Sequence, residues 1–361
     1  MKLLYIVPKI KNAGGVARVL SIKTNYFVEN FGYEIHILSQ NENGKPPFYS
    51  FNSKIHFHDI SLEGNAVVFL KSYQSQVKQK IKEIQPDVIL VADNGLKAFV
   101  FPFLIKTKIP IVFESHGSKF IEEKPFGNDF LSKTFTKVKY RFKDFAIEKF
   151  TKIVVLSEEN RKEWNVENGI VIPNPSWIQT ETVSNLKHKK VIAIARNSYE
   201  KGLDRLLLIW EKVIKKYPDW TLDIYTDDVI SLENIITDLG IKSNTNIFSF
   251  QKNIKEKYVE ASIYAMTSRS EGFPMVLLEA MACGLPCIAF DCPTGPRSII
   301  TNAENGFLIP DNNIEMYVEK LSFLMENEEV RLKFGRDAKE TSENYSVEKI
   351  MGKWRQFFEK L

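Results

Sequence analysis

Cysteine is scarce in this chain. Its 361 residues include three cysteines, Cys283, Cys287 and Cys292, all in one short stretch. An odd number of thiols, without a second cluster or a nearby histidine, excludes a disulfide scaffold and argues against a structural zinc site. We therefore expect buried thiols and a reducing, cytoplasmic setting.

Long hydrophobic runs are also missing, and no stretch approaches the length of a membrane span. The apolar stretch Leu3 to Val7 ends at Pro8 and is too short for a secretory signal peptide. No low-complexity tract or repeat of fixed period stands out, and 44% of the residues are hydrophobic and 26% charged. This composition indicates a globular protein whose length suits two α/β domains.

The familiar phosphate-binding signatures are absent from the first loop. Pro8 to Arg18 holds Asn12-Ala13-Gly14-Gly15, which matches neither G-x-G-x-x-G nor a P-loop, so nothing supports a dehydrogenase or a kinase. Paired glycines nevertheless leave room for a ligand's phosphate to reach the backbone. The alternative is a plain strand-to-helix turn.

Short apolar runs alternate with helical stretches along the whole chain. In the first half these runs are Leu3 to Pro8, Tyr33 to Ser39, Asp87 to Ala92, Ile109 to Glu114 and Lys152 to Leu156. In the second half they are Lys190 to Ala195, Thr221 to Tyr225, Asn246 to Phe250, Ile263 to Thr267, Pro286 to Phe290 and Gly306 to Ile309. The alternation predicts an α/β protein with two Rossmann-like, doubly wound parallel sheets.

The joint between the two domains is expected at the paired prolines Pro173 and Pro175, which break regular structure. We place an N-terminal domain at residues 1–175 and a C-terminal domain at 176–345. A last helix, about 346–361, carries Ile350, Trp354, Phe357 and Phe358 on one face and is expected to cross back onto the first domain. Since such sheets bind ligands beyond the carboxyl ends of their strands, a central cleft between the domains should hold the site.

The segment from Ser268 to Arg297 is the most informative. Pro274 and Gly284 bracket a short helix that is apolar on every side except at Glu279. A carboxylate there needs a partner, either a ligand's ribose hydroxyls or another side chain. Glu271 precedes the helix, whose first amides would favour a diphosphate. The structural alternative makes Glu271 a capping acid and Glu279 half of a buried ion pair.

Other candidate residues follow predicted strands. Arg196 and Lys201 come after the run that ends at Ala195, and a guanidinium with an ammonium is the usual pair for a diphosphate, although such loop cations are most often only solvated. His116 follows Glu114 at another carboxyl end, where functional residues gather, although the alternative for a lone histidine is a purely structural role. No role is assigned to His36, His56, His58 and His188.

Together these residues resemble the retaining glycosyltransferases of GT-B fold called family 4, also described as glycosyl transferases group 1. Glu271 to Glu279 matches the E-x7-E element of that family. The other matching positions are Arg196 and Lys201 for its diphosphate pair, Gly14-Gly15 for its first glycine-rich loop, and His116 for its cleft histidine. The resemblance covers nearly the whole chain and is most specific from Ser268 to Pro296.

The resemblance implies roles for these residues. Glu271 would meet hydroxyls of the transferred sugar and Glu279 the ribose, and a catalytic group of His116, Glu271, Arg196 and Lys201 would support same-face substitution with retention. The diphosphate and sugar pocket would be lined by Gly272, Phe273, Pro274, Met275 and Val276. No metal or cofactor is implied, because the family lacks a metal-binding D-x-D and Asp227-Asp228 follow a different strand as loop acids.

The resemblance also implies substrates. Cys292 to Arg297 resembles a branch that builds bacterial surface polysaccharides and glycolipids, so the expected reaction moves a hexose or N-acetylhexosamine from a UDP-sugar to a glycan or lipid-linked acceptor. The N-terminal domain would bind the acceptor and the C-terminal domain the donor. The alternatives are a sugar-nucleotide epimerase or hydrolase on the same scaffold, and a catalytically silent sugar-nucleotide-binding subunit.

Positive charge is concentrated in the first half, where residues 1–180 carry 25 Lys+Arg against 18 Asp+Glu. Much of the excess lies in Lys124 to Lys149, where aromatic and aliphatic residues alternate with cations. This mixture predicts peripheral contact with an anionic membrane at its inner face. The alternative is an amphipathic helix with a solvated basic face. No nucleic-acid partner is expected.

Overall fold

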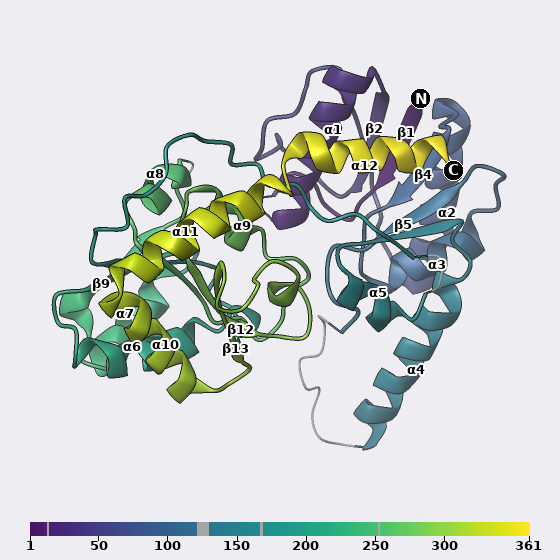
Figure 1. Ribbon diagram of the computed structural model, residues 1–361. Helices are drawn as coiled ribbons and strands as arrows, with labels where there is room; N and C mark the ends of the chain where they lie inside the picture. Colours follow the sequence, from purple (N-terminus) through teal and green to yellow (C-terminus); the bar gives the residue numbers. More distant parts are fainter. Residues whose placement is uncertain (13, 121–129, 167–168, 252) are drawn as a thin grey trace. The chain divides into compact units, whose positions relative to one another are not determined.

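The structure is a computed structural model that describes residues 1–12, 14–120, 130–166, 169–251 and 253–361. The chain divides into two compact units. Unit 1 comprises Met1–Pro175 and Val347–Leu361, and unit 2 comprises Ser176–Ser346. Each unit is a parallel β-sheet accompanied by helices (Figure 1).

Unit 1 contains the strands β1 (Lys2–Ile6), β2 (Glu34–Gln40), β3 (His56–Ile60), β4 (Val88–Val91), β5 (Ile111–Glu114), β6 (Lys152–Val155) and β7 (Gly169–Val171). Within the described residues they form one sheet in the order β3-β2-β1-β4-β5-β6-β7, with every pairing parallel. The helices of this unit are α1 (Gly15–Phe31), α2 (Ala66–Ile84), α3 (Leu96–Leu104), α4 (Phe130–Ile147), α5 (Glu158–Trp164) and α12 (Val347–Glu359).

Unit 2 contains the strands β8 (Lys190–Ile194), β9 (Thr221–Thr226), β10 (Thr245–Ser249), β11 (Ile263–Met266), β12 (Cys287–Asp291) and β13 (Gly306–Pro310). Their order in the described part of the chain is β10-β9-β8-β11-β12-β13, again all parallel. The α-helices are α6 (Leu203–Ile214), α7 (Val229–Asp238), α8 (Ile254–Val259), α9 (Met275–Ala282), α10 (Ile314–Glu326) and α11 (Glu328–Glu343), and short 3-10 turns span Tyr199–Lys201, Lys242–Asn244 and Pro296–Ser298.

The predicted fold class, two doubly wound parallel sheets, is confirmed. In each sheet the strand order reverses beside the first strand of the unit, because β1 lies between β2 and β4 and β8 lies between β9 and β11. Loops that leave the carboxyl ends of two such neighbours diverge and open a crevice, where sheets of this kind bind ligands. A ligand of unit 2 is therefore expected at the switch point of its sheet, beside β8.

The strands β3 and β7 were not predicted from the sequence. β3 reads His-Phe-His-Asp-Ile and occupies the edge of the sheet, so it lacks the apolar run that marks a strand buried on both faces. β7 has three residues, which is too few for a period to show.

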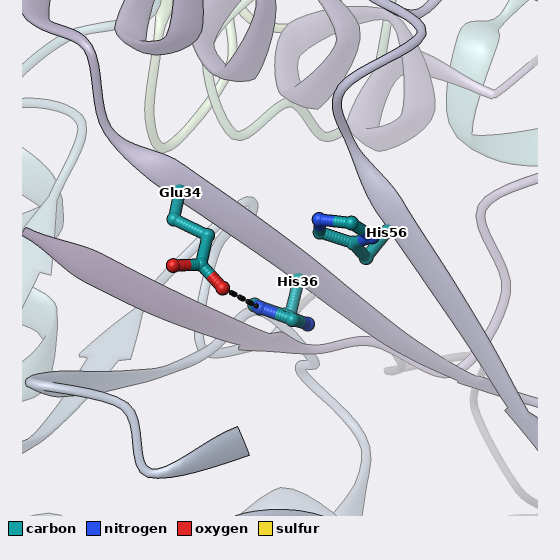
Figure 2. A group of neighbouring side chains, drawn as sticks. All are labelled: Glu34, His36 and His56. Atoms are coloured by element: carbon teal, nitrogen blue, oxygen red, sulfur yellow. Dashed lines mark hydrogen bonds and ion pairs between the residues drawn. The ribbon is translucent and has the colours of Figure 1, made fainter.

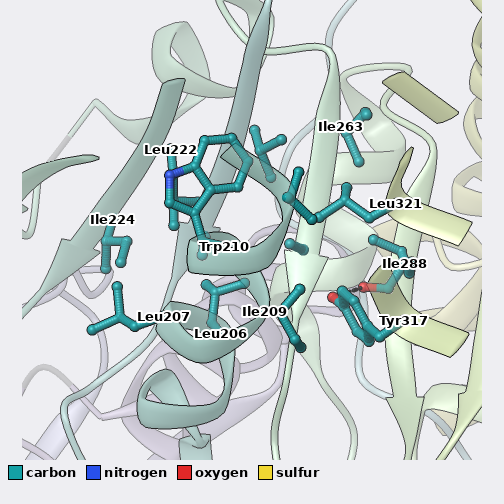
Figure 3. Close-up of a cluster of buried hydrophobic side chains, with 14 of the residues drawn as sticks. Leu206, Leu207, Ile209, Trp210, Leu222, Ile224, Ile263, Ile288, Tyr317 and Leu321 are labelled. Carbon is teal, nitrogen blue, oxygen red and sulfur yellow. Dashed lines mark hydrogen bonds between the residues drawn. The ribbon is translucent and has the colours of Figure 1, made fainter. Parts of the chain in front are cut away.

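The core of unit 2 shows how an amphipathic helix is fixed on its sheet. Trp210 of α6 is fully buried in one cluster with Leu222 and Ile224 of β9 (Figure 3). Tyr317 of α10 belongs to the same cluster, and its hydroxyl donates to the carbonyl oxygen of Ile288 at 2.9 Å, which satisfies its buried polar atom. Each buried Leu or Ile side chain here stabilises the unit by roughly 1.5–3 kcal/mol.

The last helix, α12, packs against α1 within unit 1 (Figure 1). The ring of Phe358 lies 5.7 Å from that of Phe27 and the ring of Trp354 lies 6.4 Å from it, both edge to face. The buried face of α12 consists of Ile350, Met351, Trp354, Phe357 and Phe358. Aromatic packing on α1 thus covers the apolar face that the sequence shows.

The three cysteines are free and buried, which confirms that part of the sequence prediction. Among the residues that the structure describes, no helix combines the length and the apolar character that a membrane crossing requires.

Candidate functional site

Lys201 and Glu271 form an ion pair although they are 70 residues apart. Nζ of Lys201 lies 2.7 Å from Oε1 and 2.8 Å from Oε2 of Glu271. Lys201 ends the 3-10 turn after β8, and Glu271 lies in the loop after β11. Because β8 and β11 are neighbours at the switch point, these two loops meet there.

The loop around Glu271 is held in place from several sides. The carboxylate is nearly enclosed, since the residue is 6% exposed, and the hydroxyl of Ser268 donates to Oε1 at 2.6 Å. The hydroxyl of Thr294 donates to the backbone carbonyl of Glu271. Gly295 has a φ of +97°, and a Cβ there would lie 2.6 Å from Cδ of Pro274, so only glycine permits this close approach.

Hydrogen bonds join the loop that carries Lys201 to the loop that carries Glu271. The amide of Arg269 donates to the carbonyl oxygen of Glu200 at 2.7 Å, and its guanidinium donates to that of Tyr199 at 2.8 Å. Gly202 has a φ of +64°, and a Cβ there would lie 2.2 Å from the carbonyl oxygen of Thr267. These backbone contacts therefore hold Lys201 next to Glu271 in a fixed geometry.

Arg196 has a different setting from Lys201. It is exposed, and its guanidinium has no ion-pair partner within the described part of the chain. The turn after it is ordered by Asp227, whose Oδ1 accepts from the amide of Asn197 at 2.7 Å, while Nδ2 of Asn197 donates to Asp228 at 3.2 Å. The loop acids of the sequence thus position the turn between the two cations.

Glu279 lies in α9 and is 9% exposed. Oε1 accepts from the indole N–H of Trp177 at 2.6 Å, and Oε2 accepts from the hydroxyl of Tyr258 at 2.9 Å. Burial first, and the charge of Glu279 second, raise the pKa of Tyr258 well above its ordinary value, so this donor keeps its proton. Two side chains thus supply the partners that a buried carboxylate needs.

The residues between Glu271 and the start of α9 are the others that the sequence predicts to line the pocket. Gly272, Phe273 and Pro274 are buried, whereas Met275 and Val276 are half-buried at the start of the helix. Amides in the first turn of a helix lack intrahelical partners and lie at the positive end of its dipole. This terminus can therefore receive an anion next to Glu271.

Gly14 and Gly15 stand at the start of α1 in unit 1. The amide of Gly14 donates to Oδ1 of Asn12 at 2.8 Å. A Cβ added to Gly15 would meet no described atom within 4 Å. Packing of the described residues does not require glycine at this position, whereas close approach of a ligand to the backbone would.

His116 follows β5, and its side chain is 4% exposed. Its Nε2 lies 3.4 Å from Oε1 of Glu114, which also pairs with the buried Lys23 of α1. Burial lowers the pKa of His116 to about 4, against the opposing effect of the Glu114 charge. The imidazole is therefore neutral at pH 7, and its Nε2 has no hydrogen-bond partner among the described residues.

Ser268, Gly202, Glu114 and Lys23 were not singled out from the sequence. The first two border predicted strands or turns beside candidate residues, and Glu114 is a charge at the end of an apolar run. Lys23 gives no signal of its own, because only packing of α1 on the sheet brings it to Glu114.

Mild acid should destabilise the protein through His116. In the unfolded chain its pKa returns to about 6.5, so the folded state binds fewer protons and loses stability as the pH falls from 6.5 to 4. Between pH 7 and pH 5 this group should cost about 2 kcal/mol of unfolding free energy. Urea unfolding of the wild type, His116→Gln and the control His188→Gln at both pH values measures the difference. If His116→Gln loses as much stability in acid as the other two, His116 is not buried in the neutral form.

The folds of the two units are those of GT-B glycosyltransferases, and this chain belongs to the glycosyltransferase family. Residues 177–341 match the family model of glycosyl transferases group 1, and residues 14–157 match that of glycosyl transferase 4-like proteins. An uncharacterized glycosyltransferase of Haemophilus influenzae is 30% identical, with 98% of this chain and 99% of the relative covered.

One further relative and one solved structure extend the comparison. The amylovoran biosynthesis glycosyltransferase AmsD of Erwinia amylovora is 29% identical, with 98% of each chain covered. A crystal structure of a TarM mutant of S. aureus, in complex with fondaparinux, α-GlcNAc-glycerol and UDP, is similar with a TM-score of 0.80 over 99% of each chain. Its sequence identity is 16%, so this similarity shows the fold.

Proposed function

We propose that this glycosyltransferase is a retaining, family 4 enzyme of bacterial surface-polysaccharide synthesis. It transfers a hexose or N-acetylhexosamine from a UDP-sugar to a glycan or lipid-linked acceptor. The observation that carries this proposal is the Lys201–Glu271 pair at the switch point of unit 2. UDP in the TarM complex and amylovoran biosynthesis in the name of AmsD support a UDP-linked donor and a glycan product.

The donor's diphosphate is proposed to lie against Arg196, Lys201 and the start of α9. The ammonium of Lys201 has three N–H donors and contacts two oxygens of Glu271, so one donor remains for a phosphate oxygen. The exposed guanidinium of Arg196 can bind a second oxygen pair as a planar fork. These cations stabilise the negative charge that grows on the leaving UDP. They thereby take the role that a metal ion would have at the diphosphate.

The sugar and the ribose are proposed to meet the two carboxylates. Ionised Glu271 offers about four acceptor positions, of which Lys201 and Ser268 occupy three, which leaves one for a sugar hydroxyl. Glu279, held by Trp177 and Tyr258, receives the ribose. Residues 176–345 thus bind the donor.

The reaction exchanges one C–O bond for another. The bond between the anomeric carbon and the β-phosphate oxygen breaks and the bond to the acceptor oxygen forms on the same face. The acceptor hydroxyl passes its proton to the β-phosphate oxygen of the leaving UDP. Residues 1–175 bind the acceptor, and the neutral His116 hydrogen-bonds near the transferred sugar through its Nε2. Gly14 and Gly15 let the reacting groups approach the backbone of the first loop.

A donor screen tests this function. UDP release from a panel of UDP-sugars, measured with and without glycan acceptors, should depend on the acceptor. Free sugar or an epimer formed at the same rate without acceptor would identify a hydrolase or an epimerase instead. UDP binding without turnover of any donor would identify a silent subunit.

We also propose that α4 makes peripheral contact with an anionic membrane at its inner face, from the cytoplasm. Phe135 and Val138 are 67% and 59% exposed, and Lys137 and Arg141 are exposed on the same helix. Exposed apolar side chains beside cations favour a membrane surface over a solvated basic face. The part of the basic segment at 124–129 lies outside the described residues.

Charge reversal tests this contact. Lys137→Glu with Arg141→Glu should weaken the binding of the full chain to phosphatidylglycerol vesicles, measured by flotation, by at least about thirtyfold, since each cation near such a surface contributes about 1 kcal/mol. Lys242→Glu with Lys333→Glu changes the same charge on exposed residues of unit 2 and should leave flotation unchanged. Equal flotation of both double variants would reject α4 as the contact.

A further inference from the structure

Three of the five histidines of the chain gather at one edge of the sheet of unit 1. His36 lies on β2, and His56 and His58 lie on the edge strand β3, with His36 directly opposite His56 in the parallel register. The ring of His36 lies 4.7 Å from that of His56 and 5.2 Å from that of His58. Side chains two residues apart on a strand share a face, so the three imidazoles stand on the same side of the sheet.

A carboxylate joins this histidine cluster. Glu34 precedes His36 by two residues on β2, and its Oε1 lies 2.9 Å from Nε2 of His36. One ligand atom from each of Glu34, His36 and His56 can be chosen so that all three lie within 4.8 Å of one another. Figure 2 shows the three side chains side by side, with the contact between Glu34 and His36 marked.

We propose that Glu34, His36 and His56 bind a divalent transition-metal ion, for which Zn²⁺ is the best match. Two imidazole nitrogens and one carboxylate oxygen form a donor set that zinc accepts, with water in the fourth position. Zinc bonds of about 2.0–2.2 Å place tetrahedral ligand atoms about 3.4 Å apart, so the group must close around the ion. His36 is buried and serves as the anchor, whereas Glu34 and His56 are exposed and can turn toward it.

His58 contacts the ring nitrogen of His36 that does not bind the metal. Its Nε2 lies 2.9 Å from Nδ1 of His36. When the metal occupies Nε2 of His36, the proton of that ring resides on Nδ1 and donates to Nε2 of His58. A hydrogen bond of this kind to the far nitrogen fixes the tautomer and the orientation of a ligating histidine.

Lys2 shows that this position already attracts a cation. Its Nζ lies 3.1 Å from Oε1 of Glu34 and also donates to the carbonyl oxygen of Ile84 at 3.0 Å. The metal ion takes over the contact with the carboxylate, and Lys2 keeps its bond to Ile84.

The position of the site in the sheet indicates a structural role. Glu34 and His56 are the first residues of β2 and β3, so the metal lies at the amino ends of the strands, whereas ligands of such sheets bind at the carboxyl ends. The ion joins the edge strand β3, which pairs on one side only, to its neighbour β2. This inference does not depend on the proposed transfer reaction.

Zinc binding by the full chain, freed of metal by a chelator and carrying no histidine tag, tests the site. In competition with a chromophoric chelator, the wild type should bind one Zn²⁺, and His56→Asn and Glu34→Gln should each weaken the affinity by at least about tenfold. His188→Asn removes an exposed histidine of unit 2 and should leave the affinity unchanged. All these residues are exposed, so the variants are expected to fold.

A second readout follows from linkage, since an ion that binds only the folded state raises its stability. Saturating Zn²⁺ should raise the thermal midpoint of the wild type and of His188→Asn but not that of His56→Asn. Absence of Zn²⁺ binding in the wild type would overturn the site. Unchanged affinity in both His56→Asn and Glu34→Gln would overturn it as well.

Discussion

Replacing Glu271 with alanine should lower kcat by about 10²–10³-fold, the loss that accompanies removal of one preorganised group at a reacting centre. The structure places this carboxylate between Lys201 and Ser268 at the switch point of unit 2. Its loss removes both the proposed acceptor for a sugar hydroxyl and the charge that positions the lysine. Acceptor-dependent UDP release measures the effect.

The fold should survive this change, because the lysine left behind has a side chain that is 25% exposed and can turn to water. We expect a loss of unfolding free energy below about 2 kcal/mol. Glu271→Gln, which keeps the shape but not the charge, should lose a comparable share of turnover. Glu304→Ala, at an exposed position, should retain full turnover. Full activity in Glu271→Ala would remove Glu271 from the site.

Gly202→Ala should destabilise unit 2 by about 3 kcal/mol or more and should also reduce turnover. The left-handed φ costs an alanine about 1–2 kcal/mol, and the added Cβ, 2.2 Å from the carbonyl oxygen of Thr267, forces the two loops apart. Lys201, the preceding residue, then moves away from Glu271. Urea unfolding and UDP release measure the two effects.

Gly240→Ala is the matched control for this variant. Gly240 also has a left-handed φ, +68°, but a Cβ there would meet no described atom within 4 Å. It should cost about 1 kcal/mol and leave turnover unchanged. Equal stability losses in the two variants would mean that the close approach to Thr267 does not fix the Lys201 loop.

The alternating apolar runs were sufficient to predict both sheets, because strands buried on two faces carry near-continuous hydrophobic residues. The edge strand β3 gave no such signal, since it is half polar. The sequence therefore does not place the histidines of β3 in the sheet, and their proximity to His36 follows only from the pairing of β3 with β2.

The sequence nominates candidate residues for the site but does not give their contacts. Glu279 needed a partner because its helix is apolar, but its donors come from Trp177, 102 residues away, and from Tyr258. The pairing of Lys201 with Glu271 depends on β8 lying beside β11, an adjacency that skips two strands in the sequence. His116 was placed at a strand end, whereas its burial beside Glu114 and Lys23 depends on the packing of α1.

Hydrogen–deuterium exchange of the full chain with and without UDP tests most directly whether unit 2 holds the nucleotide at its switch point. We predict that saturating UDP slows exchange in peptides covering residues 196–202 and 268–276. Protection confined to other parts of the chain, or no change at any UDP concentration, would contradict a nucleotide site built on Arg196, Lys201, Glu271 and the start of α9.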